Sequence, residues 1–119
     1  FQLAANTWTD TGIDSTDLAT GTYAMQAYVS DFSVGGGHYY EYYSGMMSWY
    51  SQSTNSAKVD EIPVHRAGHA PNNGDVQFRT QRHESGVLML QVKHNLSYTA
   101  ALNNSDGGKI FRFKFRRLI

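Results

Sequence analysis

A cluster of aromatic side chains follows the triple glycine Gly35–Gly37, and its residue types suit stacking on a flat ligand. The cluster contains Tyr39, Tyr40, Tyr42, Tyr43, Trp49 and Tyr50. Exposed tyrosine and tryptophan rings offer an apolar face with a polar tip, which stacks on sugar rings and also packs well in protein interfaces. We therefore expect a carbohydrate-binding site formed by Tyr40, Tyr42, Trp49 and Tyr50. The alternative is that one aromatic set lies in the core and the other in a subunit interface.

The tyrosines of this cluster cannot all be buried if the segment is a strand. Successive side chains of a strand face opposite ways, so Tyr40 and Tyr42 share one face while Tyr39 and Tyr43 share the other. Both faces look alike in the sequence. The pattern therefore predicts that one set is exposed and leaves open which set that is.

A second candidate is the segment His65-Arg66-Ala67-Gly68-His69, in which two histidines are four positions apart. On a helix this spacing would place two imidazoles on one face and suit zinc, but Pro63, Gly68 and Pro71 argue against a helix. We therefore expect neither a metal site nor a cofactor here. The predicted role of His65, Arg66 and His69 is to donate hydrogen bonds to hydroxyl or acidic groups of a ligand, or to contact a neighbouring subunit.

Paired carboxylates could act as general acid and base in hydrolysis, and the chain offers two such pairs. Asp14 and Asp17 lie in a segment rich in Thr, Ser and Asp, where carboxylates commonly accept hydrogen bonds from local main-chain amides. Asp60 and Glu61 have no motif around them. The sequence contains no nucleophile elbow, phosphate loop or catalytic triad, and it has no cysteine to act as a nucleophile. It therefore predicts a protein that is not an enzyme.

The composition indicates one domain over residues 1–119, with no preference for nucleic acid or membrane. Charged residues make up 17% of the chain and their formal net charge is zero, which argues against strong binding to polyanions. No apolar run approaches the roughly 20 residues that a membrane span requires. The charge is nevertheless uneven, because all ten Lys and Arg residues lie from Lys58 onward. Pairing of the two halves across a sheet or subunit boundary is one interpretation, and a basic binding patch is the other.

The elements that must position these residues are strands. Residues 110–116 alternate Phe with Arg or Lys, a period of two that predicts a half-buried strand close to the end of the chain. Further strands are predicted over residues 22–29, 39–43, 46–50, 61–65, 76–82 and 87–93, separated by turn clusters and, between residues 43 and 46, by a tight turn at Ser44-Gly45, with a strand and loop in the first 20 residues. No helical period exceeds about two turns. About seven or eight short strands with this spacing indicate an all-β antiparallel β-sandwich of jelly-roll type.

Several segments resemble the C-terminal domains of tailed-bacteriophage tail fibres and tailspikes. They are NTWTDTGI at Asn6–Ile13, the segment Thr22–Val29, VGGGHYYEYYSG at Val34–Gly45, MSWY at Met47–Tyr50, HRAGH at His65–His69 and FRFKFRRLI at Phe111–Ile119. Such domains are β-rich, form homotrimers at the distal end of a fibre, and bind bacterial surface glycans or lock the trimer. The resemblance implies a C-terminal fragment of a longer virion protein. Its ligand residues vary too much to be carried over by position.

These observations together predict a non-enzymatic domain of a phage tail fibre or tailspike that recognises a host. Its expected partners are a bacterial surface polysaccharide (lipopolysaccharide or capsule) and two further copies of itself. One alternative is a C-terminal trimerisation and folding cap without a ligand, with the aromatics buried between subunits. Another is a carbohydrate-binding module of a secreted polysaccharide-degrading enzyme, which would be a monomer.

Overall fold

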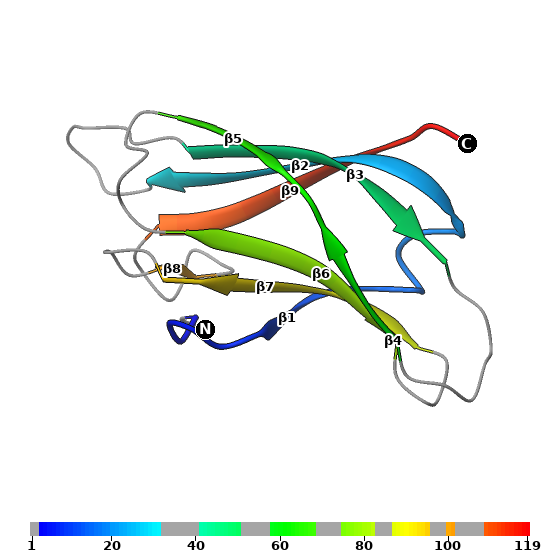
Figure 1. Cartoon of the computed structure of the whole chain (residues 1–119), viewed down its shortest axis with the longest axis horizontal. Helices are drawn as coiled ribbons and strands as arrows, with labels where there is room; N and C mark the ends of the chain where they lie inside the picture. Colours follow the sequence, from blue (N-terminus) through cyan, green and yellow to red (C-terminus); the bar gives the residue numbers. More distant parts are fainter. Residues whose placement is uncertain are drawn as a thin grey trace.

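Alternation of buried and exposed side chains runs through almost every long strand of this chain. The computed structural model describes residues 3–31, 41–50, 58–68, 75–82, 87–95, 100–101 and 109–119. Within these residues the chain forms strands and no helix, so no helix capable of spanning a membrane is found there. The strands are β1 (Thr9–Asp14), β2 (Gly21–Asp31), β3 (Glu41–Trp49), β4 (Lys58–Ile62), β5 (His65–Gly68), β6 (Val76–Arg82), β7 (Leu88–His94), β8 (Ala100–Ala101) and β9 (Lys109–Arg117) (Figure 1).

The strands form two sheets. One sheet has the order β1-β7-β6-β4 and the other the order β5-β3-β2-β9-β8. All pairs are antiparallel except β8 with β9, which is parallel. The consecutive strands β2–β3 and β6–β7 pair within one sheet. The consecutive strands β8 and β9 also pair, and the other five connections between successive strands cross from one sheet to the other.

The two sheets pack face to face around one apolar core, which confirms the predicted all-β sandwich. Each sheet contributes alternate residues, because side chains two apart on a strand share a face. The ring of Phe78 on β6 contacts Tyr43 on β3 and Phe111 and Phe113 on β9, at centroid distances of 5.5, 6.5 and 6.0 Å. These edge-on contacts between sheets are a favoured aromatic geometry. Trp49, Met25 and Leu90 are fully buried in the same core.

Residues 41–49 form one continuous strand, whereas the sequence predicted two strands separated by a turn at Ser44-Gly45. A Cβ on Gly45 would overlap the carbonyl oxygen of Pro63 and lie 3.2 Å from Cγ1 of Val64. Glycine here allows the connection between β4 and β5 to pass closely over β3. Pro63 lies in that connection, so the predicted strand over residues 61–65 is instead two edge strands, one in each sheet.

The Phe-rich segment near the end of the chain is the strand that the sequence predicted. Phe111 is buried, Phe113 and Phe115 pack against the core, and the basic side chains between them point away from it. β9 pairs along its whole length with β2 from the first half of the chain. The cross-strand neighbours of Arg112, Lys114 and Arg116 are the uncharged residues Tyr28, Gln26 and Ala24. The two halves therefore do pair across a sheet, as one interpretation of the charge distribution predicted, but this pairing does not neutralise β9.

Candidate functional site

The outer face of the five-stranded sheet carries a pair of stacked tyrosines. Tyr28 on β2 lies directly opposite Tyr42 on β3, and the ring centroids are 6.1 Å apart with the planes inclined by 28°. Tyr42 is 50% exposed, and Tyr28 is partly exposed. Because its neighbour supports it, the Tyr42 ring presents a flat apolar surface without having to be ordered by a ligand.

A shallow groove of about 470 Å³ runs beside this tyrosine pair. Its outward-facing polar side chains are Gln26, Ser44 and Lys114, from three adjacent strands. Gln26 offers an amide donor and acceptor, Ser44 a hydroxyl and Lys114 an ammonium donor. An apolar platform next to a few polar groups is the arrangement that orients a small polar ligand.

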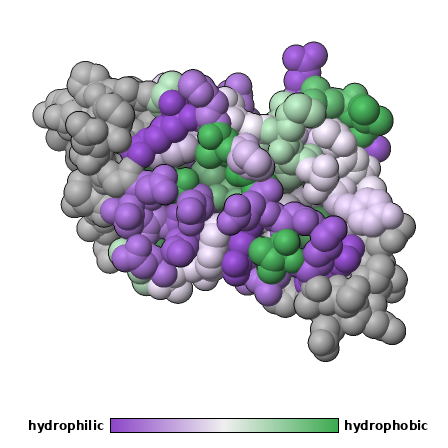
Figure 2. Space-filling model, viewed as in Figure 1, coloured by the Kyte–Doolittle hydropathy of each residue, from purple (hydrophilic) through white to green (hydrophobic). Residues whose placement is uncertain are grey.

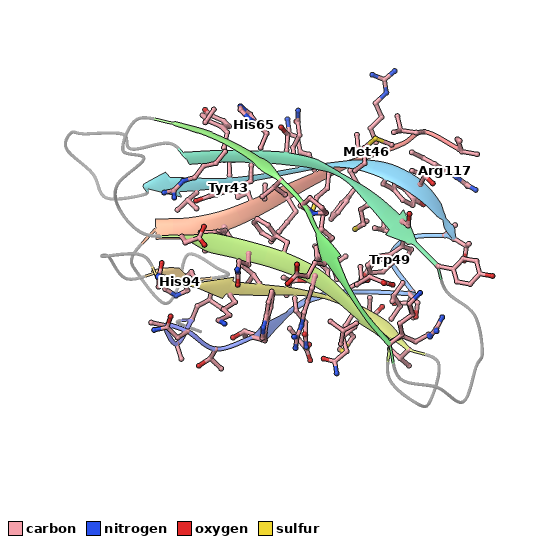
Figure 3. The ribbon with its side chains drawn as sticks, viewed as in Figure 1. Tyr43, Met46, Trp49, His65, His94 and Arg117 are labelled. Atoms are coloured by element: carbon pink, nitrogen blue, oxygen red, sulfur yellow. The ribbon has the colours of Figure 1, made fainter. Side chains whose placement is uncertain are left out.

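His65 belongs to the same face. On the edge strand β5 it lies opposite Ser44, and Ala67 lies opposite Tyr42. His65 is therefore diagonal to Tyr42, at a Cα distance of about 7–8 Å. Figure 3 shows His65 on the outer side of this sheet. The structure thus brings together two of the predicted ligand residues, Tyr42 and His65.

Trp49 was predicted to stack on a ligand, and this prediction is wrong. Its side chain is completely buried, and its indole Nε1–H donates a hydrogen bond of 3.0 Å to the main-chain carbonyl oxygen of Leu18. Trp49 shares the inward face of β3 with Tyr43 and Met47, both 1% exposed. Figure 3 shows Trp49 on the side of its sheet that faces the other sheet. Trp49 is a core residue.

Tyr50 and Arg66 do not join Tyr42. Tyr50 is 50% exposed but lies beyond the far end of β3, roughly 26 Å away, because eight residues at about 3.3 Å each separate it from Tyr42. It lines a different, polar pocket together with Lys58, Asp60 and Arg82. Arg66 faces the other side of β5, with its guanidinium carbon 5.6 Å from the ring centroid of Tyr43. Tyr40 and His69 lie outside the described residues.

The two carboxylate pairs are not arranged as an acid and a base. Asp14 and Asp17 cap a turn, as the sequence predicted: the Asp14 amide donates to Asp17 Oδ2 at 2.9 Å, and the Thr16 amide donates to Asp14 Oδ1 at 2.8 Å. Hydrogen bonds from the Thr16 hydroxyl and amide hold the pKa of Asp14 below its ordinary value. Asp60 and Glu61 are adjacent on β4, so they face opposite ways.

A metal centre is likewise not found among the described side chains, where no group of three or more His, Asp or Glu residues could hold an ion.

Tyr28, Gln26 and Lys114 are members of this groove that were not singled out in the sequence. The sequence did indicate that Tyr28 faces outward. Residues 22–29 alternate, and Tyr28 lies two positions from Gln26, a residue type that is rarely found in a core. Lys114 alternates with the phenylalanines of residues 110–116, so the sequence indicated that it faces outward as well. What the sequence lacked was the register that places Tyr28 opposite Tyr42 and Lys114 opposite Gln26.

The outer face of the four-stranded sheet is built differently. Gln91 is almost buried there and joins two charged residues: it accepts a hydrogen bond from Arg79 Nε and donates one to Asp10 Oδ1, both of 2.7 Å. The guanidinium of Arg79 also lies over the ring of Trp8, 4.1 Å from its centroid. Asp10 and Arg79 are thus both bonded to Gln91, and Arg79 also contacts an aromatic ring. The tyrosine groove on the opposite face is therefore the better candidate for a ligand site.

Comparison of this chain with protein-family models, with curated proteins and with solved structures found no match.

Proposed function

We propose that this chain is the C-terminal domain of a phage tail fibre or tailspike and that it binds bacterial surface polysaccharide, lipopolysaccharide or capsule, through the groove beside Tyr28 and Tyr42. The observation that carries the proposal is the half-exposed ring of Tyr42, stacked with the ring of Tyr28. Sugars present apolar C–H faces that stack on such a ring, while their hydroxyl groups bond to amide, hydroxyl and ammonium groups. Gln26, Ser44 and Lys114 supply those groups at the groove.

The proposed role is recognition without catalysis. Cleavage of a glycosidic bond ordinarily requires two carboxyl groups on either side of that bond. The described side chains that line the groove include no carboxylate. The groove is also open and shallow, which suits an extended polymer that lies across the sheet.

A homotrimer at the distal end of the fibre is part of the proposal. Met46, Leu118 and Ile119 are 65%, 46% and 84% exposed, and Figure 2 shows apolar surface at the end of the molecule where the chain terminates. Exposed apolar side chains gathered in one region suit contact between subunits. The same observation favours a second candidate function, a trimerisation and folding cap.

The direct test of the site is polysaccharide binding by Tyr28→Ala and Tyr42→Ala, measured on lipopolysaccharide and capsule preparations. Each variant is expected to lose at least tenfold in affinity, because ring stacking is the main apolar contact of the groove. Tyr42→Phe keeps the ring and is expected to retain most of the binding. Tyr50→Ala is the matched control, since Tyr50 is as exposed as Tyr42 but lies at the other end of β3.

Solution mass measured by light scattering separates the candidate functions. A mass of three chains together with glycan binding fits the fibre domain. A trimer that binds no glycan, and dissociates when Met46 and Leu118 are replaced by Ser, fits the cap. A stable monomer that binds glycan fits a carbohydrate-binding module. Equal binding by folded Tyr42→Ala and the unsubstituted chain would refute the site.

A further inference from the structure

The face that carries the tyrosine groove is positively charged although the chain as a whole is neutral. The outward-facing side chains of β9 are Arg112, Lys114 and Arg116, and His65 lies across the same face on β5. The outward-facing neighbours on β2 and β3 are uncharged; they are Thr22, Ala24, Gln26 and Tyr28 on β2 and Tyr42, Ser44, Met46 and Ser48 on β3. The described side chains of this face thus include the exposed cations Lys114 and Arg116 and no carboxylate.

The outer face of the four-stranded sheet carries acids as well as cations. Asp10, Asp14 and Glu61 occur at outward-facing positions of the four-stranded sheet, together with the cations Arg79 and Lys93. Asp10 and Arg79 are further connected through Gln91. The uneven charge of the sequence therefore becomes a difference between two faces, one basic and one mixed. A ligand on the basic face meets a positive potential that the net charge of zero conceals.

Lys114 is both one of the basic side chains of this face and a lining residue of the groove. It lies opposite Gln26 on β2. Gln26 lies opposite Ser44 on β3, and Ser44 lies opposite His65 on β5. Strands are about 4.8 Å apart, so Lys114 and His65 are separated by roughly 14 Å across the sheet. Arg112, directly opposite Tyr28, adds a second cation beside the stacked rings. A group that stacks on Tyr42 thus lies two strands, roughly 10 Å, from the basic side chains of β9, within reach of a further acidic group of an extended ligand.

We propose that the ligand of this groove is an acidic polysaccharide, whose carboxylate or phosphate groups are bound by the cations of β9 while a sugar ring stacks on Tyr42. This inference rests on the proposed glycan-binding function and specifies its substrate class. A nucleic acid is the less suitable polyanion. Its bases need successive separate aromatic platforms, whereas Tyr28 and Tyr42 are stacked on one another.

The test is a panel of bacterial polysaccharides that includes neutral polymers, uronic-acid polymers and phosphate-containing polymers, probed with the whole 119-residue chain. Each acidic polymer that binds is then tested after reduction of its carboxyl groups or removal of its phosphate, which identifies the acidic group. Binding confined to acidic polymers, weakened by either treatment and by added salt, supports the inference. Lys114→Gln is expected to weaken that binding about three- to tenfold.

Lys58→Gln is the control variant, because it removes the same charge from an exposed position on β4, away from the groove. Preference for neutral polymers, or equal weakening by Lys58→Gln and Lys114→Gln, would overturn the inference while the glycan-binding function stands. Binding to none of the polymers would overturn both. Tighter binding to a single-stranded oligonucleotide than to any polysaccharide would also overturn both.

Discussion

The indole Nε1–H of Trp49 donates a hydrogen bond to the carbonyl oxygen of Leu18, which ties the end of β3 to the loop before β2. Trp49 is completely buried, so water does not reach its indole Nε1–H. Trp49→Phe is expected to lower the free energy of unfolding by about 1–3 kcal/mol, because the Leu18 carbonyl loses a buried partner and a small cavity forms. Urea denaturation measures the change. Tyr50→Phe, at the adjacent exposed position, should change stability by less than about 0.5 kcal/mol; equal effects would show that Trp49 is not a core anchor.

Gly45 is required by the close passage of the β4–β5 connection over β3. Because a Cβ there would overlap the Pro63 carbonyl oxygen, Gly45→Ala is expected to cost about 1–3 kcal/mol of stability, as for other overpacked sites. Ser44→Ala, one position away on the exposed face, serves as the control and should be close to neutral in stability. The measurement is the midpoint of thermal unfolding. A Gly45→Ala variant as stable as the unsubstituted chain would contradict the packing described for this connection.

Gln91 joins Asp10 and Arg79 across the outer face of the four-stranded sheet. Gln91→Leu removes both hydrogen bonds, so we expect a loss of about 1–3 kcal/mol in the free energy of unfolding. The same substitution at exposed Gln77, on the neighbouring strand β6, tests whether leucine on this face is harmful in itself. If Gln91→Leu and Gln77→Leu behaved alike in urea denaturation, the hydrogen-bonded chain would contribute nothing measurable.

The pKa of Asp14 is lowered chiefly by the Thr16 hydroxyl, which donates a hydrogen bond to Oδ1 at 2.5 Å, and next by the Thr16 amide. A carboxyl whose pKa is lower in the folded than in the unfolded state stabilises the fold above its unfolded pKa of about 3.9. That stabilisation is lost as the pH falls through the folded pKa. Thr16→Val should raise the pKa of Asp14 toward its ordinary value, as followed by NMR titration of the carboxyl carbon. Thr7→Val, which removes a hydroxyl bonded to Ala5, should leave it unchanged, and an unmoved Asp14 titration in Thr16→Val would refute the assigned cause.

Local patterns in the sequence were sufficient for the architecture. Alternation in residues 110–116 and 76–82 predicted strands whose inward residues are those found in the core, because a period of two is a property of each strand by itself. The turn at Asp14–Asp17 could likewise be predicted from neighbouring residues alone. The predicted turn at Ser44-Gly45 was wrong because the reason for glycine there is the distant Pro63.

The sequence by itself determined that this chain forms strands with one apolar face each, and that Tyr42 and Tyr43 would face opposite ways. Only the tertiary structure decided which tyrosine faces the core, that Trp49 is buried, and that Tyr28 and Lys114 lie beside Tyr42. Those outcomes depend on strand order and register, which are set by contacts between residues far apart in the chain. A shift of one residue in register would exchange the two faces of a strand, and no local pattern in the aromatic cluster distinguishes them.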